Sequence, residues 1–193
     1  MDWQDRYLRG DTPWDKGTSA PSLSPLIEQK PELFANQRVF VPGCGLGHDA
    51  KEFAKHGLDV VAADISPFAI ERAKEENPHG VDFRELNILK IDHDLVGFFD
   101  IVWEHTCFCA LDPNLRSDYV VAMSERLKPN AVLLGVFFTN PDAAPNEGPP
   151  YKTSRKELCE IFSSHFALEW VDEPKECYPG REGCEHLMLF KKL

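Results

Sequence analysis

The chain has 193 residues, a length that suits one domain with a single substantial core. Its 32 Asp and Glu residues outnumber its 21 Lys and Arg residues, so the formal net charge is −11. A surface this acidic repels phosphate backbones and anionic lipids, which argues against nucleic acid or a membrane as partner. No apolar run approaches the roughly 18–20 residues of a membrane span, and the N-terminus lacks the apolar core of a signal peptide. We therefore expect a cytoplasmic protein.

The six cysteines form no C-x-x-C pair and show no zinc-binding spacing. We interpret them as free thiols, with a redox or metal role as the alternative. Two of them, in Cys107-Phe108-Cys109, are better explained as buried apolar residues than as nucleophiles. The others are Cys44, Cys159, Cys177 and Cys184.

The first half of the chain starts with an irregular segment and then alternates between strands and helices. Residues 1–21 are rich in Trp, Tyr, Asp, Gly and Pro and show no helical or strand period, so we expect a loop with many turns. Apolar spacing favours a helix over residues 22–34, although Pro25 and Pro31 restrict it. Apolar runs then predict strands over 38–41, 58–63, 81–86 and 98–103. Helices are expected over 47–55 and, with Ser66 as N-cap, from Pro67 to about residue 76.

The second half continues the alternation and adds two further strands. A helix is expected over 113–127, ended by Lys128-Pro129-Asn130, and a fifth strand over 131–138. A proline-rich loop over 140–153 precedes a helix over 154–164 and an antiparallel pair of strands near 166–171 and 186–191. Parallel strands need helical crossovers, so the pattern predicts an α/β fold. We expect a single doubly wound, mostly parallel, seven-stranded sheet, Rossmann-like, with an antiparallel C-terminal edge strand. Residues 1–193 would form one domain, with a lid segment over 1–21 and an α/β core over 38–193.

The strongest local signal is the glycine-rich loop Gly43-Cys44-Gly45-Leu46-Gly47, between the first predicted strand and the helix after it. Glycines let the backbone approach a ligand closely, and α/β folds bind ligands beyond the carboxyl ends of their strands. Asp64 directly follows the second predicted strand, about 20 residues further on, where a carboxylate accepts hydrogen bonds from ribose hydroxyls. Loop and acid together indicate a cofactor that contains a nucleoside.

The spacing of the glycines distinguishes between cofactors. The dinucleotide fingerprint G-x-G-x-x-G would need a third glycine where the chain has His48, whereas the chain has G-x-G-x-G. The latter form is typical of class I S-adenosylmethionine (SAM) methyltransferases, whose cofactor carries no pyrophosphate. A tight strand–helix turn without a ligand and an NAD-binding dehydrogenase are the alternatives at this point.

Several segments, in order along nearly the whole chain, resemble the thiopurine S-methyltransferase family, including its plant halide/thiol and bacterial branches. They are Trp3-Gln4-Asp5-Arg6-Tyr7, Thr12-Pro13-Trp14-Asp15, residues 39–45, Asp64-Ile65-Ser66, residues 103–111 with Pro113 and Arg116, and Gly148-Pro149-Pro150-Tyr151. Methyltransferases usually carry an acid two residues before the first glycine, where this chain has Val41. The following residue, Pro42, matches the glycine loop of the thiopurine S-methyltransferase family.

The resemblance implies a SAM site built from residues spread over the chain. The implied cofactor-binding residues are Trp3, Tyr7, Trp14, Gly43, Gly45, Asp64, Asn87, Ile88, Glu104 and His105. Within this set, Gly43 would contact the methionine portion, Asp64 the ribose, and Asn87 with Ile88 the adenine. Trp14 would also face the substrate, and Tyr151 would belong to a substrate lid.

Two assignments stay open on the residues alone. The three N-terminal aromatics could plug the core, although aromatic rings also attract a sulfonium through cation–π interaction. His105 is the candidate catalytic residue because an imidazole could accept a proton from an incoming thiol. The alternative is a structural histidine that donates to a neighbouring carbonyl.

We predict a SAM-dependent S-methyltransferase, similar to thiopurine S-methyltransferase, that methylates a small soft nucleophile by in-line displacement. The acceptor would be a thiol, a halide or thiocyanate, or a metalloid compound. We expect SAM as cofactor, S-adenosylhomocysteine as product, no metal, and a monomer. The alternatives are a non-catalytic protein of the same fold that binds SAM or a nucleoside and, less favoured, an NAD-linked oxidoreductase.

Overall fold

The computed structural model describes residues 1–76, 80–139 and 147–193. The chain divides into two compact units, Met1–Lys90 and Ile91–Leu193. Among the described residues, no helix has both the length and the apolar character that a membrane crossing requires. Part of the predicted loop over 140–153, residues 140–146, lies outside the described residues.

The first unit begins with three short helices: α1 (Trp3–Leu8), α2 (Leu23–Gln29) and α3 (Pro31–Phe34). The expectation of an irregular segment over 1–21 was therefore wrong for α1, which starts where the side chain of Asp2 accepts the N–H of Asp5. This helix has six residues and buries only Tyr7, so it leaves no apolar period to detect. The helix expected over 22–34 is divided at Lys30, because a residue before proline is disfavoured in the helical conformation.

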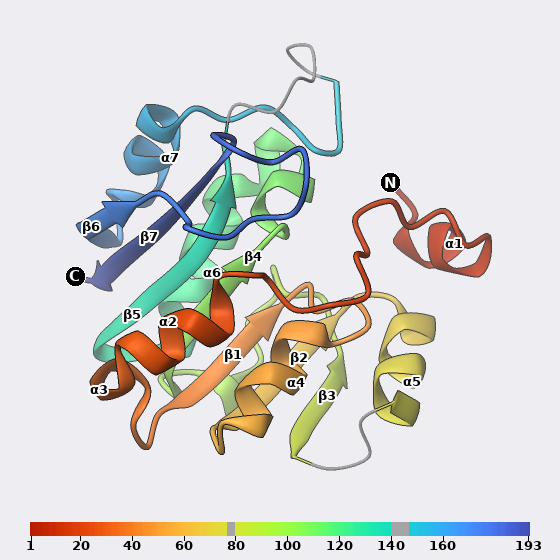
Figure 1. The fold of residues 1–193 in the computed structure, drawn as a ribbon, viewed down its shortest axis with the longest axis horizontal. Coiled ribbons are helices and arrows are strands. Elements are labelled where there is room, and N and C mark those ends of the chain that lie inside the picture. Colours follow the sequence, from red (N-terminus) through yellow and green to blue (C-terminus); the bar gives the residue numbers. More distant parts are fainter. Residues whose placement is uncertain (77–79, 140–146) are drawn as a thin grey trace. The chain divides into compact units, whose positions relative to one another are not determined.

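The rest of the first unit is a parallel three-stranded arrangement with two crossover helices (Figure 1). Its elements are β1 (Arg38–Pro42), α4 (His48–Lys55), β2 (Asp59–Asp64), α5 (Pro67–Glu76) and β3 (Val81–Glu85), and they confirm the predicted alternation. The strands lie in the order β3-β2-β1. Pro67 is the first residue of α5, and the hydroxyl oxygen of Ser66 accepts the N–H of Ala69, as a cap does. The carboxyl ends of β1 and β2 thus lie side by side.

The second unit carries four strands in the order β4-β5-β7-β6 (Figure 1). Its elements are β4 (Phe99–His105), α6 (Arg116–Arg126), β5 (Leu127–Phe138), α7 (Arg155–Phe162), β6 (Phe166–Asp172) and β7 (Glu185–Lys192). Short 3-10 turns occupy His93–Leu95, Phe108–Ala110 and Pro113–Leu115. β4 and β5 are parallel, whereas β7 runs antiparallel to both β5 and β6. The expected antiparallel pair is confirmed, with β6 at the edge.

The boundary between the expected helix over 113–127 and the fifth strand was wrong. Lys128-Pro129-Asn130 was expected to separate helix from strand, but β5 already begins at Leu127, directly after α6. Pro129 has no N–H to donate to a neighbouring strand, and Asn130 has a positive φ of 64°. Both residue types are typical of turns. The strand accommodates them through a register shift against β4 between Phe99 and Ile101.

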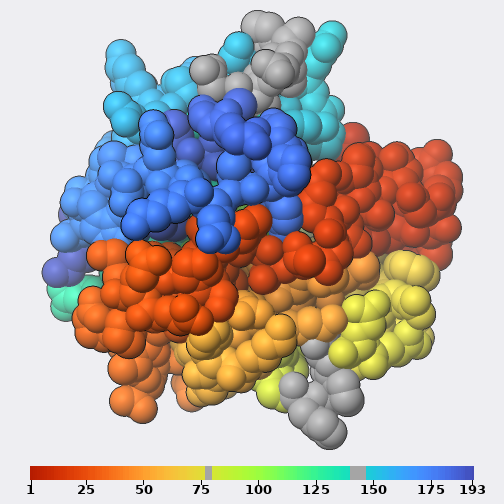
Figure 2. Space-filling view, viewed as in Figure 1, coloured from red at the N-terminus to blue at the C-terminus, as the bar shows by residue number. Residues whose placement is uncertain are grey.

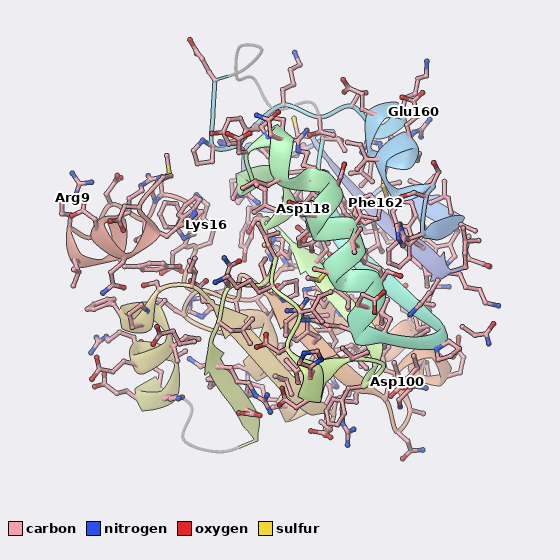
Figure 3. All side chains as sticks on the ribbon, turned by 180° about the vertical axis from the view of Figure 1, so that it is seen from behind. Arg9, Lys16, Asp100, Asp118, Glu160 and Phe162 are labelled. Carbon is pink, nitrogen blue, oxygen red and sulfur yellow. The ribbon has the colours of Figure 1, made fainter. Side chains whose placement is uncertain are left out.

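A cluster of phenylalanines forms the core of the second unit. Phe162 lies on α7 (Figure 3). Its ring lies 4.9 Å from that of Phe190 and 5.3 Å from that of Phe108. Phe108 belongs to the 3-10 turn that follows β4, so these contacts fix the turn next to the end of that strand. His105, the last residue of β4, is therefore attached to a packed segment.

Candidate active site

The glycine loop of the first unit is held in a conformation that excludes side chains. Gly43, Gly45 and Gly47 have φ values of 58°, 54° and 78°, in the left-handed region that favours glycine. A Cβ on Gly45 would lie 2.8 Å from the hydroxyl oxygen of Tyr7, and a Cβ on Gly47 would lie 2.6 Å from the Phe83 ring. The G-x-G-x-G pattern is thus required by both the backbone and its close neighbours.

Asp64 connects the end of β2 to this loop. Its Oδ2 accepts the N–H of Gly45 at 2.9 Å, and its Oδ1 accepts the N–H of Ser66 at 2.9 Å. Burial raises the pKa of the carboxyl above its usual range, against the lowering effect of these backbone donors. The N–H of Ile65 also contributes to this lowering. A carboxylate has about four acceptor positions, so these backbone donors leave capacity for a ligand hydroxyl.

The three predicted N-terminal aromatics lie together. The Trp14 ring makes edge contacts with Trp3 at 5.3 Å and with Tyr7 at 5.7 Å between centroids, and its Nε1–H donates to the Tyr7 hydroxyl at 3.3 Å. Because that hydroxyl also lies against Gly45, the cluster reaches the glycine loop. Sequence reasoning missed Arg6, whose guanidinium lies 4.3 Å from the centroid of the Trp14 ring.

The segment that carries the aromatics is attached to α4 at two points. Asp15 lies 3.0 Å from Nε2 of His48, the first residue of α4. Further along, the N–H of Ala20 donates to the buried carboxylate of Asp49 at 2.7 Å. Asp49 therefore has a role beyond the helix-dipole effect expected of an acid in a first turn.

These two acids bear on the choice of cofactor. A dinucleotide places its pyrophosphate at the helix N-terminus after the glycine loop. Here Asp49 lies within the first turn of α4, and Asp15 contacts its first residue. Two carboxylates at this position disfavour a pyrophosphate, whereas they suit a nucleoside cofactor that carries positive charge.

Asn87 and Ile88 follow β3 and lie near Asp64 in the first unit. The N–H of Leu86 donates to the backbone oxygen of Asp64 at 3.0 Å, which brings the next two residues to the same ends of the strands. The side-chain oxygen of Asn87 accepts the N–H of Leu89, and Ile88 is buried. The structure thus brings together the predicted residues of this unit.

In the second unit, Glu104 anchors the segment that follows His105. Its Oε1 accepts the N–H groups of Cys107 at 3.0 Å and Phe108 at 2.8 Å, and its Oε2 accepts the hydroxyl of Tyr119. Glu104 is 1% exposed, and burial raises the pKa of its carboxyl. Because protein donors contact both oxygens, the structure gives Glu104 an anchoring role that the resemblance did not imply.

His105 lies at the end of β4, half-buried and in contact with a tyrosine. Its ring stacks on that of Tyr178 at 6.0 Å with an interplanar angle of 19°. Thr106, the next residue, has a φ of 61°, an uncommon and strained value for a β-branched residue. Such strain persists only where surrounding contacts impose it, and the hydrogen bonds from the N–H groups of Cys107 and Phe108 to Glu104 hold the chain directly after Thr106.

Tyr151 is fixed to the same segment through its backbone. Its N–H donates to the carbonyl of Cys109 at 2.7 Å, and its carbonyl accepts Nη2 of the buried Arg116 at 3.2 Å. The Arg116 guanidinium also lies 5.0 Å from the Phe108 ring centroid. The late loop with Tyr151 is thus held next to the turn after β4.

All six cysteines lie among the described residues and carry free thiols. Burial raises the pKa of Cys109 to about 12, far from that of a nucleophile. Within the described ranges, no group of three or more His, Cys, Asp or Glu side chains could hold a metal ion.

Sequence reasoning missed Tyr178, Arg116 and the anchoring role of Glu104. Tyr178 lies in the connection between β6 and β7, which has no periodic pattern, so only the tertiary fold reveals its contact with His105. Arg116 was noted only as part of a matching segment, and Glu104 only as an implied cofactor-binding residue. What distinguishes these two side chains is their burial, which cannot be seen in the sequence.

Comparisons with known proteins agree on one family. The family model described as thiopurine S-methyltransferase matches residues 1–183. The chain is 31% identical to "Probable thiol methyltransferase 2" of Arabidopsis thaliana, over 98% of this chain and 84% of the relative. It is 30% identical to "Thiocyanate methyltransferase 1" of the same plant, over 99% of this chain and 84% of the relative.

The fold of this chain is similar to that of a solved structure. The 1,6-didemethyltoxoflavin-N1-methyltransferase of Burkholderia thailandensis, with bound S-adenosylhomocysteine, matches with a TM-score of 0.75 at 18% identity. The match covers 97% of this chain and 84% of that one. The predicted fold is confirmed: a doubly wound, mostly parallel, seven-stranded sheet with antiparallel strands at its C-terminal end.

Proposed function

The chain belongs to the thiopurine S-methyltransferase family and is a SAM-dependent methyltransferase, and we propose that its acceptor is a small soft nucleophile. The acceptor class comprises thiols, halides or thiocyanate, and metalloid compounds. The names of the two plant relatives, a probable thiol and a thiocyanate methyltransferase, support this class. The single observation that carries the cofactor assignment is Asp64, buried and hydrogen-bonded to the glycine loop with acceptor capacity left.

The residues of the first unit fit this cofactor. Asp64 would accept the ribose hydroxyls, Gly43 and Gly45 would lie against the methionine portion, and Asn87 with Ile88 would border the adenine. The cluster of Trp3, Tyr7 and Trp14 offers aromatic surface to a sulfonium. When bound, SAM supplies an electrophilic methyl group.

In the second unit, we assign His105 the handling of the acceptor's proton. A protonated thiol needs a base, and an imidazole nitrogen of His105 would accept its proton. Thiocyanate or iodide carries no such proton, so for these acceptors His105 would only shape the site. Glu104 and Tyr178 position His105 through the turn that follows it and through ring stacking. Tyr151 of this unit would contact the acceptor and exclude water. For the first unit, the resemblance implies Trp14 as a residue that faces the acceptor.

Composition bears on the kind of acceptor. The net charge of −11 supports a small-molecule acceptor over nucleic acid. We further propose a single catalytic domain over 1–193, a monomer, and a cytoplasmic location.

The experiment is an acceptor screen with isotopically labelled SAM in matched pairs. Thiophenol and phenol differ only in the attacking atom, and thiocyanate and iodide test acceptors that have no proton. We expect methyl transfer to thiophenol or to one of the anions, and none to phenol. Transfer to phenol without transfer to any sulfur, halide or metalloid acceptor would contradict the proposed class.

A further inference from the structure

We propose that Gln4 is a positioning residue: its carboxamide couples closure of the N-terminal segment to the shape of the turn that holds the SAM ribose. The inference rests on the proposed function and adds a residue to it that acts through Asp64 rather than on the ligand. It concerns the first unit alone.

Gln4 reaches from α1 to the start of α5. Its Oε1 accepts the hydroxyl of Ser66 at 2.5 Å and the N–H of Phe68 at 3.1 Å. The first N–H groups of a helix have no partner within it, and Pro67 has none to offer. The first turn of α5 is thus capped partly by its own Ser66, through Ala69, and partly by a side chain from the N-terminal helix.

The same hydrogen bonds continue to the ribose acid. The N–H of Ser66 donates to Oδ1 of Asp64, whose Oδ2 accepts the N–H of Gly45. Ser66 is fully buried, so its hydroxyl must find a partner, and Gln4 supplies it. A connected path therefore runs from Gln4 through Ser66 and Asp64 to the glycine loop.

A second contact of α1 reaches the same place. Tyr7 lies three residues after Gln4, so both side chains share one face of the helix. The Tyr7 ring lies 6.4 Å from that of Phe68, and its hydroxyl lies against Gly45. Figure 2 shows the N-terminal residues, in red, resting on α5, in yellow. Docking of α1 and the geometry around Asp64 thus depend on each other.

The test compares three variants at the N-terminus with the wild type. Gln4→Leu removes the acceptor at similar size, and Gln4→Glu keeps an acceptor oxygen. Arg9→Gln is the control, because Arg9 is the exposed residue directly after α1 and forms an ion pair with Asp5 on the surface (Figure 3). The measurements are the Kd for S-adenosylhomocysteine, KM for SAM against kcat, the Tm of the ligand-free protein, and tryptic cleavage after the exposed Lys16.

We expect Gln4→Leu to raise both the Kd for S-adenosylhomocysteine and the KM for SAM about tenfold, with little change in kcat at saturating SAM. A tenfold change corresponds to the loss of one to two hydrogen bonds. In the wild type, S-adenosylhomocysteine is expected to slow cleavage after Lys16, and Gln4→Leu to lose that protection. Gln4→Glu should restore both the affinity for S-adenosylhomocysteine and the protection from cleavage, and Arg9→Gln should match the wild type. If Gln4→Leu does not fold, Gln4→Ala takes its place.

Wild-type Kd and wild-type protection in Gln4→Leu would overturn the inference, and so would a failure of Gln4→Glu to restore them. A Tm loss in Gln4→Leu with unchanged Kd would also overturn it, since the role would then be structural only. If the wild type itself binds no S-adenosylhomocysteine, the proposed function fails instead.

Discussion

Asp64 performs two tasks with one carboxylate. It holds Gly45 and Ser66 through their N–H groups, and it keeps acceptor capacity toward a ligand. The two tasks can be separated by substitution, because asparagine keeps one acceptor oxygen whereas alanine keeps none.

We expect Asp64→Asn to weaken binding of S-adenosylhomocysteine about tenfold or more while the protein stays folded. Hydrogen bonds to a charged acceptor are worth about 1.5–3 kcal/mol. Asp64→Ala is expected to weaken binding further, because two backbone donors lose their partner as well. Calorimetric titration with circular dichroism as the folding control checks this, and wild-type affinity in a folded Asp64→Asn would remove Asp64 from the ribose site.

His105 is tested by comparing acceptors on one variant. If His105 accepts the thiol proton, His105→Ala should lower kcat/KM for a high-pKa thiol about 10²–10⁴-fold more than for thiocyanate or iodide. The ratio cancels losses of packing or SAM affinity that affect both acceptors. Equal losses would mean that His105 positions groups without accepting a proton.

Asp64 and His105 illustrate which features of single residues can be predicted from the sequence. Asp64 was found because its place relative to the glycines is a local pattern. The partner of His105 was not, because Tyr178 comes from a distant connection without any period. Residues that act through tertiary contacts leave no spacing to detect.

At the scale of elements, α1 is the one that the sequence concealed. It buries only Tyr7, and its stability in the fold comes from Gln4 on α5 and from Trp14 over Tyr7. The longer elements were predictable because their apolar periods persist. Turn-like residues inside β5, by contrast, misled the boundary because the pairing with β4 overrides local preference.

Removing residues 1–17 is expected to abolish turnover and SAM binding and to leave the α/β core folded. The truncation removes the aromatic cluster and the Gln4 cap, whereas the strands begin only at Arg38. Circular dichroism measures whether the core stays folded, and titration with S-adenosylhomocysteine measures whether the cofactor site is lost. Full activity in the truncated chain would show that Trp3, Tyr7 and Trp14 are not site residues.

The turn after β4 gives a prediction with a defined pH dependence. Burial raises the pKa of Glu104 in the folded protein. Its contribution to stability is therefore fully present below the unfolded value, about 4.3, and is lost as pH rises through the folded value. Glu104→Gln cannot ionise, so its free energy of unfolding should rise relative to that of the wild type across this window.

Urea unfolding at several pH values from 4 upward measures that difference, and a difference that does not change with pH would contradict the raised pKa. Glu104→Ala is the companion variant. It leaves the N–H groups of Cys107 and Phe108 and the Tyr119 hydroxyl without their acceptor, at about 1–3 kcal/mol for each group that stays unsatisfied.

At the scale of the whole molecule, the alternation of elements was sufficient to predict the class of fold. The family match over residues 1–183 then limits the chemistry to methyl transfer. The carboxylates at the start of α4 and the glycine spacing both favour a cofactor without phosphates. The acceptor is the part that sequence and fold specify least, because it depends on a few side chains.

The central claim, that this protein binds SAM and its product, is tested most directly by thermal unfolding with S-adenosylhomocysteine and, in parallel, with NAD. At about 100 times its Kd, a ligand that binds only the folded state adds roughly 2.7 kcal/mol to the free energy of unfolding. We predict a clear rise in Tm with S-adenosylhomocysteine and none with NAD. No rise with saturating S-adenosylhomocysteine, in protein shown to be folded, would contradict the account.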